Sequence, residues 1–409
     1  MALASSILQR GTRAAQPAAA TANTGIFYIV TDEDFTLEQS DGSAWVRVNP
    51  RASGFANAIL NGGFTFANRQ NAGVTATYSN TAARVYGPDR WGITNENASV
   101  EYIRVATDTP ETGITARFYG TFTKITNAGK LCLSHVIEGT DGFKYRGRTV
   151  RVQLKLKAST ATTVRVALME LAAAGTLDTV PGYSAGAPSG TFISAFGVDG
   201  TDPTFGTNLA KITPVTADNA TIATSALTCS VTTAWQRFGG TFTLPSDYKN
   251  LVLVVFTNAD MGTTASLSIT EVGLYNSASV VEWDDLPFGT LQSLLPRYYY
   301  KSFPVSTIPA QSAGLTGAWR GHVSVAGASA NQPIGVQFPL PVRLASPTIT
   351  FFNPSNADAF VRNTTASTNA TATAAANNSR ESMDIMFTGI AAWTVAQAVA
   401  VHFTVDSEL

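Results

Sequence analysis

The stretch VRVQLKLK, residues 150–157, alternates strictly between apolar and polar side chains. Successive side chains of a strand point to opposite faces of its sheet, so the four aliphatic residues are predicted to face a core and the others water. Residues 164–168 (VRVAL) and 266–270 (SLSIT) repeat the pattern, whereas residues 251–256 (LVLVVF) are apolar on both faces. The last stretch is typical of a central strand that is covered on both sides.

Such stretches recur from residue 55 to residue 283, separated by Gly, Thr, Asn and Asp, and indicate an antiparallel jelly-roll sandwich. Three short strands with turns between them predict a small β-meander at 26–54, after a flexible, Ala-rich segment at 1–25. Residues 284–409 contain further short strands and predict a β-rich C-terminal domain. An Ala/Thr/Asn tract within it, 363–379, is predicted to be an exposed loop. The predicted fold class is therefore all-β.

Composition narrows the possible partners. Of the 409 residues, 13% are charged, and the formal net charge is −1, so no field attracts phosphate and nucleic acid is not expected as a partner. The most apolar run has the length of a strand, so membrane insertion is not expected either. Cys132 and Cys229 are far apart in sequence, and Cys132 is predicted to be a small core residue.

Catalytic and metal-binding motifs are missing from the sequence, so we expect neither an enzyme nor a cofactor. The three histidines, His135, His322 and His402, have no metal-ligand spacing, and the sequence lacks a Cys-x-x-Cys pair and a Gly-x-Ser-x-Gly elbow. Acidic residues cluster at 32–34, at 282–285 and at Asp199 with Asp202. Acidic side chains in turns commonly bind nearby backbone N–H groups, which accounts for such clusters. The last cluster is also compatible with a structural Ca²⁺ ion.

Sugar-binding candidates lie in two places. An insertion at 178–218 is rich in Gly, Pro and aromatic residues, and connections this long are usually functional or disordered. Aromatic rings can stack on the apolar face of a sugar while polar side chains bind its hydroxyls. The alternative is that these aromatic residues pack their own loops or subunit contacts. The candidates are Tyr183, Asp199, Asp202, Phe205 and Asn208 in the insertion, and Trp319, Arg320 and Asn353 in the C-terminal domain.

Seven short motifs stand in order along nearly the whole chain: GTRAAQPA at 11–18, NGGF at 61–64, FANRQ at 66–70, DRW at 89–91, RYYYKS at 297–302, FPLPVR with SPT between 338 and 348, and DSEL at 406–409. In this order they resemble the tail fibre proteins of tailed bacteriophages, whose jelly-roll domains open with similar motifs. The sequence departs from the family at Val342, where Met is usual, and at Tyr300, where Glu is common. It also has one extra residue between Arg343 and Pro347.

The resemblance implies a virion location, a homotrimer and a role in attachment to the host. Residues 1–25 would then bind another tail or collar protein, and the partner of the distal part would be a glycan of the host surface. Two other functions stay open. One is a purely structural collar or head fibre, and the other is a polysaccharide depolymerase, although no parallel β-helix repeat is detectable in the sequence.

Overall fold

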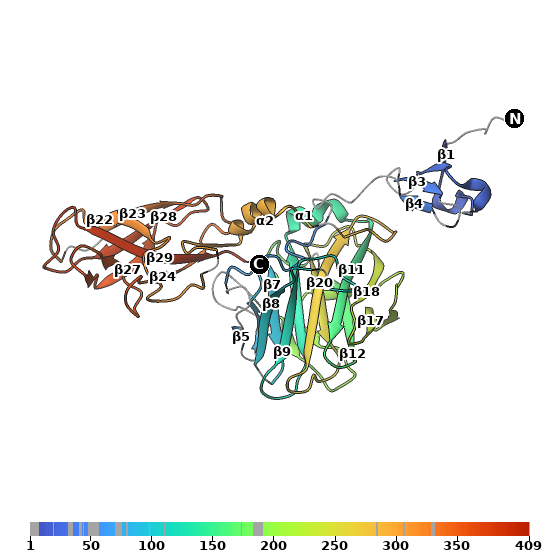
Figure 1. Ribbon diagram of the computed structural model, residues 1–409, viewed down its shortest axis with the longest axis horizontal. Helices are drawn as coiled ribbons and strands as arrows, with labels where there is room; N and C mark the ends of the chain where they lie inside the picture. Colours follow the sequence, from blue (N-terminus) through green and yellow to red (C-terminus); the bar gives the residue numbers. More distant parts are fainter. Residues whose placement is uncertain are drawn as a thin grey trace.

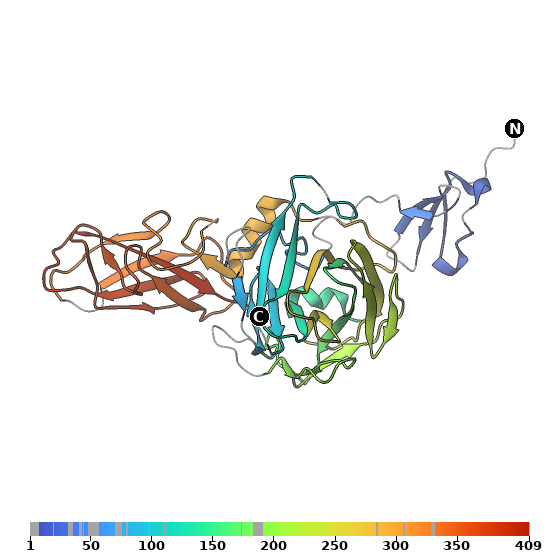
Figure 2. The same cartoon turned by 60° about the horizontal axis from the view of Figure 1, so that its bottom comes forward.

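The computed structural model describes residues 8–18, 20–31, 36–40, 43, 45–47, 57–69, 76–78, 81–97, 99–109, 111–172, 174–182, 191–283, 285–305, 307–328 and 332–408. Figures 1 and 2 show an elongated molecule in which a small sheet, a large sandwich and a second β-domain follow one another along the long axis. The described residues are mostly strands joined by antiparallel pairing, which confirms the predicted all-β class. Among them, no helix has the length and apolar character needed to cross a membrane.

The N-terminal sheet has the strand order β1-β2-β3-β4. Strands β2, β3 and β4 form the predicted antiparallel meander, and β1 pairs with β2 in parallel. Residues 8–11 of the segment expected to be flexible therefore form a strand, while residues 1–7 lie outside the described residues. The Arg13 guanidinium also binds the buried Glu38 carboxylate through two contacts of 2.7 and 2.9 Å. The strands are β1 (Leu8–Gly11), β2 (Phe27–Val30), β3 (Thr36–Ser40) and β4 (Trp45–Arg47), with 3-10 helices at Arg13–Ala15 and Thr21–Asn23.

Two sheets form the sandwich. We call the first the open sheet, with the order β18-β11-β20-β9-β8-β5, and the second the covered sheet, with the order β16-β17-β12-β19-β10-β7-β6 and β15 beside β12. The open sheet contains β5 (Ala76–Tyr78), β8 (Val100–Ala106), β9 (Phe118–Lys124), β11 (Thr149–Ala158), β18 (Gln236–Thr243) and β20 (Ser266–Tyr275). The covered sheet contains β6 (Thr81–Tyr86), β7 (Trp91–Asn95), β10 (Leu131–Ile137), β12 (Thr162–Leu171), β15 (Leu209–Ile212), β16 (Thr221–Ala223), β17 (Ala226–Val231) and β19 (Asn250–Thr257). A helical turn, α1 (Gly139–Gly142), and a 3-10 turn, Phe143–Tyr145, follow β10.

The alternation at 150–157 determines the core. The four aliphatic residues of β11 are fully buried between the sheets, where they meet residues of β10, β12 and β19. On the other face Lys155 and Lys157 are partly exposed, as predicted, but Arg151 and Gln153 are buried. The reason is that later parts of the chain lie across them. Arg151 forms an ion pair with Asp218 and donates to the carbonyl of Ala278, and Gln153 binds the backbone of Val281.

The insertion closes the outer face of the covered sheet. Val180, Phe192 and Ile193 pack against β10, β12 and β19, so β19 is covered on both faces as its sequence predicts. Two short strands of the insertion, β13 (Ile193–Ala195) and β14 (Thr204–Phe205), pair with each other. The buried Lys130 ammonium donates to the carbonyl oxygens of Phe196, Gly197 and Val198 at 2.7 to 3.0 Å. One buried cation therefore fastens this part of the insertion to the sandwich.

The change Lys130→Met should release that part of the insertion. The methionine keeps an apolar stem but leaves several buried carbonyl groups without their charged donor, which we expect to cost about 2–4 kcal/mol of unfolding free energy. Limited proteolysis should then cut near residues 196–201 faster than in the wild type. Lys144→Met, at an exposed position, is the matched control and should change neither quantity. Equal cleavage of all three proteins would contradict the fastening role.

The distal domain has two sheets around a second core. The long central strand β29 pairs with β21, β22, β24 and β25, and β28 lies between β23 and β27. Helix α2 (Phe288–Leu294) and a 3-10 turn, Leu295–Arg297, lead into it. The strands are β21 (Tyr299–Lys301), β22 (Trp319–His322), β23 (Gln332–Gln337), β24 (Thr348–Phe352), β25 (Arg362–Asn363), β26 (Thr368–Asn369), β27 (Ala372–Ala376), β28 (Ser382–Thr388) and β29 (Ala398–Asp406).

The Ala/Thr/Asn tract at 363–379 is not the exposed loop that its composition predicts. It contributes to β25 and forms β26 and β27, and β27 pairs with β28 over its whole length. Ala370 is buried in the distal core, and Asn363 is fully buried because its side chain binds Gln397 and the backbone of Thr365. Small side chains suit this edge because the core beneath is filled by larger residues of β28 and β29.

Candidate functional site

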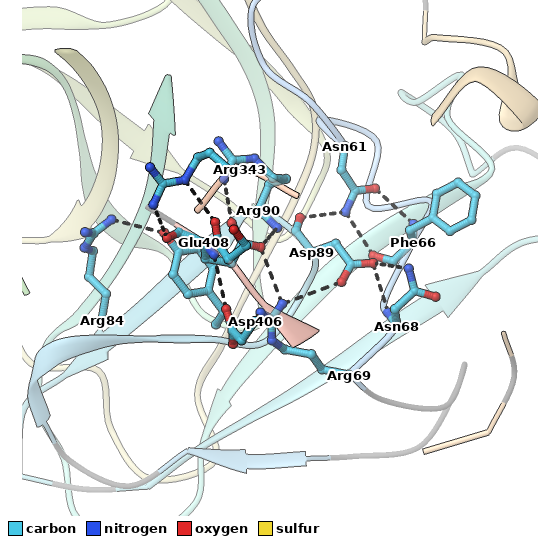
Figure 3. Close-up of polar contacts among 12 residues, drawn as sticks. Asn61, Phe66, Asn68, Arg69, Arg84, Asp89, Arg90, Arg343, Asp406 and Glu408 are labelled. Atoms are coloured by element: carbon cyan, nitrogen blue, oxygen red, sulfur yellow. Dashed lines mark hydrogen bonds and ion pairs between the residues drawn. The ribbon is translucent and has the colours of Figure 1, made fainter. Parts of the chain in front are cut away.

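Four of the sequence motifs meet where the distal domain joins the sandwich. Figure 3 shows Arg69, Asp89 and Arg90 of the sandwich facing Asp406 and Glu408 from the end of the chain. Glu408 and Arg90 are both buried, and their carboxylate and guanidinium groups are 2.5 Å apart. Glu408 also accepts a hydrogen bond from the Arg90 backbone at 3.2 Å. We call the following residues the junction cluster: Arg69, Asp89, Arg90, Tyr298, Tyr299, Lys301, Asp406 and Glu408.

The RYYYKS motif supplies the other half of the junction cluster. The Arg90 guanidinium lies 3.7 Å from the centre of the Tyr298 ring, and the Arg69 guanidinium lies 3.8 Å from that of Tyr299. Lys301 crosses the boundary and donates to the carbonyl of Asn68 at 2.8 Å. Tyr299 and Tyr300 are neighbours in β21 and point to opposite faces, whereas Tyr298 precedes the strand at the end of the 3-10 turn, so alternation does not extend to it. Tyr300 packs instead into the distal core, against Phe338 and Phe403.

The cluster also contains a buried carboxyl group with an altered proton affinity. Asp89 accepts hydrogen bonds from the backbone and the side chain of Asn68 at 3.0 and 2.8 Å. Burial raises the pKa of Asp89 to about 6, and the Arg69 guanidinium opposes this increase. Since the Arg90–Glu408 pair is buried and Arg69 pairs with Asp89, Asp406 and Glu408, the cluster can hold two domains together but leaves little room for a ligand.

The change Glu408→Gln should destabilise the joint. It leaves the Arg90 guanidinium buried without its anion, and breaking a buried pair in this way costs about 3–5 kcal/mol. Denaturant unfolding followed by tryptophan fluorescence measures the loss. Asp108→Asn is the control, since Asp108 is 99% exposed and its 3.9 Å pair with Arg117 should contribute little. A loss no larger than that of the control would show that the Arg90–Glu408 pair does not hold the domains.

Asp89 should give the chain a measurable pH dependence. Its carboxyl group titrates at a pKa of about 6 in the folded chain against 3.8 as the ordinary value, so between these values the unfolded chain binds fewer protons. Stability is therefore expected to fall as the pH rises from 3.8 to about 6. Asp89→Asn removes this contribution, while Asp406 and Glu408 remain. A wild-type profile that runs parallel to that of the variant over this range would contradict the assignment.

A second cluster of polar and aromatic side chains lies on the outer face of the open sheet. Residues 111–117 lead into β9, and the Glu111 carboxylate accepts hydrogen bonds from Tyr119, Lys157 and Trp235 at 2.7, 2.7 and 2.8 Å. The rings of Tyr119 and Trp235 meet edge to face, 5.2 Å apart. The Lys157 ammonium lies 4.9 Å from the centre of the Trp235 ring. We call these four residues the Glu111 cluster.

Glu111 fixes the orientation of the two rings by binding both of their polar atoms. Although burial acts in the opposite direction, the hydrogen bonds from Lys157, Tyr119 and Trp235 lower the pKa of Glu111 to about 2. The carboxylate is therefore charged at neutral pH and accepts from all three donors. Trp235 is half-buried rather than buried, so part of its indole ring is exposed to solvent. An oriented, partly exposed ring beside charged groups can stack on a flat apolar ligand face.

A pocket of about 130 Å³, which we call the Lys155 pocket, lies on the same sheet face. One of its lining residues, Glu271, is at a bulge where the register between β11 and β20 shifts. The φ angle of Glu271, +51°, is in the left-handed region. The Glu271 side chain binds Lys155 at 2.7 Å and accepts from Thr115 and Ala116. Bulges and strained residues are common beside functional sites. The lining consists of Thr115, Gln153, Leu154, Lys155, Arg237, Glu271, Val281, Glu282 and Trp283.

The candidates in the insertion mostly have structural contacts. Phe205 packs edge to face on Phe192 and on Phe256 of the covered sheet. The Asp202 carboxylate binds Arg165 at 2.8 Å and Lys211 at 2.5 Å. Exposed Asp199 accepts a hydrogen bond from the backbone N–H of Asp260. Asn208 has a φ of +65°, and its backbone carbonyl accepts a hydrogen bond from the N–H of Ala172. Tyr183 lies outside the described residues.

The candidates in the distal domain do not gather into one site with those of the insertion. Trp319 is half-buried and packs on the distal core, with its ring 6.4 Å from that of Phe403. Asn353 is fully buried, and its side chain binds Asp358 and the backbone of Ser355. Arg320 is exposed on β22, and no hydrogen bond or ion pair of its side chain is found among the described residues. The described contacts of these positions place none of them beside Phe205 or Asp202.

The described residues contain no group of three or more His, Cys, Asp or Glu side chains placed to bind a metal ion. Asp202, considered for Ca²⁺, already binds two cationic side chains. Cys132 and Cys229 are free and buried, which confirms Cys132 as a core residue, and burial raises the pKa of Cys229 to about 12. Of the other acidic clusters, residues 32–34 and Asp284 lie outside the described residues, and Asp285 accepts a hydrogen bond from Thr65.

No protein-family model and no curated protein matches this chain. Solved structures that are similar to it include a study of "CBM4 structure and function", with 17% identity, a TM-score of 0.27, and coverage of 53% of this chain and 98% of that one. Another is TmCBM61 in complex with β-1,4-galactotriose, at 9% identity, a TM-score of 0.29, and coverage of 54% and 99%. A third is the enzymatically active domain of tailspike protein 4 from bacteriophage CBA120, at 12% identity, a TM-score of 0.28, and coverage of 55% and 22%. At such identities and TM-scores these likenesses establish neither a ligand nor an activity for this chain.

Proposed function

We propose that the chain is a tail fibre or similar surface appendage of a bacteriophage virion, which attaches the particle to glycan on the host surface. It acts by contact, with no bond broken. The observation that supports this best is the Glu111 cluster, where Glu111 holds a half-buried Trp235 and Tyr119 in fixed orientation on the outer face of the open sheet. Such a ring can stack on the apolar face of a pyranose, while nearby charged and hydroxyl groups bind its hydroxyls.

The order of the sequence motifs supports the virion location. The four motifs that meet at the junction cluster share one structural task, because they hold the distal domain against the sandwich. A fixed joint gives such an elongated appendage a defined shape (Figure 1). In this proposal the N-terminal sheet binds a tail or collar protein. Three copies of the chain associate, so that weak glycan contacts gain strength through effective concentration.

The change Trp235→Ala tests the binding face. The full-length chain is applied to an array of bacterial surface polysaccharides, and the variant should bind the recognised glycan roughly tenfold more weakly or worse, since buried aromatic contacts dominate such interfaces. Thermal unfolding should change little, because the Trp235 ring is half-buried at the surface of the sandwich. Arg320→Ala, an exposed change in the distal domain, is the control and should bind like the wild type.

The other outcomes contradict the proposal in different ways. Loss of binding in Arg320→Ala but not in Trp235→Ala would move the site to the distal domain. Wild-type protein that binds no polysaccharide would favour a purely architectural collar or head fibre. Shorter saccharide products after incubation would favour a depolymerase. A monomer in light scattering at micromolar concentration would overturn the trimeric part of the proposal.

A further inference from the structure

We propose that the Lys155 pocket recognises a carboxylate on the bound sugar, so that the preferred ligand is an acidic glycan of the uronic acid class. This inference rests on the proposed function, because it assigns the ligand chemistry of the same sheet face. It begins with the pairing of β11 and β18, which are neighbours in the open sheet (Figure 1). In this pairing Lys155 is directly opposite Arg237.

Two cations directly opposite each other on one sheet face destabilise the pairing unless anions neutralise them. Glu271 neutralises Lys155 at 2.7 Å. For Arg237, no hydrogen bond or ion pair of its guanidinium is found among the described residues, and its side chain is exposed. Glu282 lines the same pocket without forming an ion pair to Arg237 within the described part of the chain. Arg237 is therefore left without a direct ion pair beside the paired Lys155.

Apart from the exposed Glu282 carboxylate, the hydrogen-bonding groups of the pocket that are left unengaged are donors. Glu271 has its oxygens engaged by Lys155, Thr115 and Ala116, and Gln153 is engaged at both ends of its amide by Val281. These donors are the Arg237 guanidinium and two of the three Lys155 N–H groups. Donors of this kind match the two oxygens of a carboxylate.

The pocket is placed to act together with the Glu111 cluster. Lys155 and Lys157 are two residues apart on β11 and share a face, which separates them by about 7 Å along the strand. Trp235 directly precedes β18 and is two residues before Arg237 in sequence. Thr115, which lines the pocket, is in the same segment as Glu111. A sugar ring stacked on Trp235 would therefore bring a substituent of the same or the next residue within reach of Arg237 and Lys155.

The experiment compares two probes, an oligomer of a uronic acid and a neutral hexose oligomer of the same length and linkage. Isothermal titration calorimetry with the full-length chain should show tighter binding of the acidic oligomer, and added salt should reduce the difference. Arg237→Gln should lower affinity for the acidic oligomer about tenfold or more and leave affinity for the neutral one unchanged. Arg237→Lys keeps the charge but loses the planar guanidinium group, so its affinity for the acidic oligomer should lie between those of the wild type and Arg237→Gln. Arg380→Gln, an exposed change in the distal domain, is the matched control.

The outcomes separate this inference from the proposed function. If both oligomers bind equally and Arg237→Gln changes neither, the carboxylate assignment is wrong although glycan binding stands. If neither acidic nor neutral saccharides bind the wild type, the proposed function fails, and the carboxylate assignment with it. If Arg237→Gln weakens both oligomers to the same extent, Arg237 is a general contact and does not select acidic sugars.

Discussion

The sandwich and its outer polar face depend on one constraint, the strict two-face alternation of β11. Its inward face supplies four aliphatic residues to the core between the sheets, so the strand cannot shift register by one residue without burying Lys155 and Lys157. Its outward face supplies the cations around which both the Glu111 cluster and the Lys155 pocket are arranged. Core packing and site geometry are thus coupled through a single strand. The strained backbone of Glu271 on the neighbouring strand is held in place by the bonds that its carboxylate makes across this face.

The outer faces of the two sheets differ in what covers them. The insertion packs on the covered sheet, which places that sheet's outer face in a second apolar cluster, and the buried Lys130 helps to hold it there. The open sheet keeps a polar outer face with a pocket and partly exposed aromatic residues. At one end of the sandwich the junction cluster attaches the distal domain through buried ion pairs and cation–ring contacts (Figure 3). Such pairs contribute little net stability compared with apolar packing, but they require specific geometry, which is what a joint of fixed orientation needs.

Much of the fold follows from local patterns. The alternation at 150–157 and the doubly apolar run at 251–256 identify strands and their burial, because a strand's period is independent of distant contacts. The parallel strand at 8–11 and the paired tract at 363–379 were not predictable from composition, since both depend on partners elsewhere in the chain. The structural contacts of the sugar-binding candidates were not predictable for a related reason. Phe205 and Asp202 have the residue types of a binding loop, but covering a sheet needs the same types. Glu111, Tyr119, Lys157 and Trp235 are spread over more than a hundred positions, so no local motif identifies them, although the outward lysines of β11 were a usable signal.

Hydrogen–deuterium exchange of the full-length chain, with and without its recognised glycan, tests most directly whether the open sheet is where contact occurs. Our account predicts slower exchange on binding in peptides that cover residues 111–119, 155–157 and 232–238. The peptides of the insertion around residues 191–212 and those of the distal strands should be unaffected. Protection that appears instead in the insertion or in the distal domain, with none at 111–119 and 232–238, would contradict it.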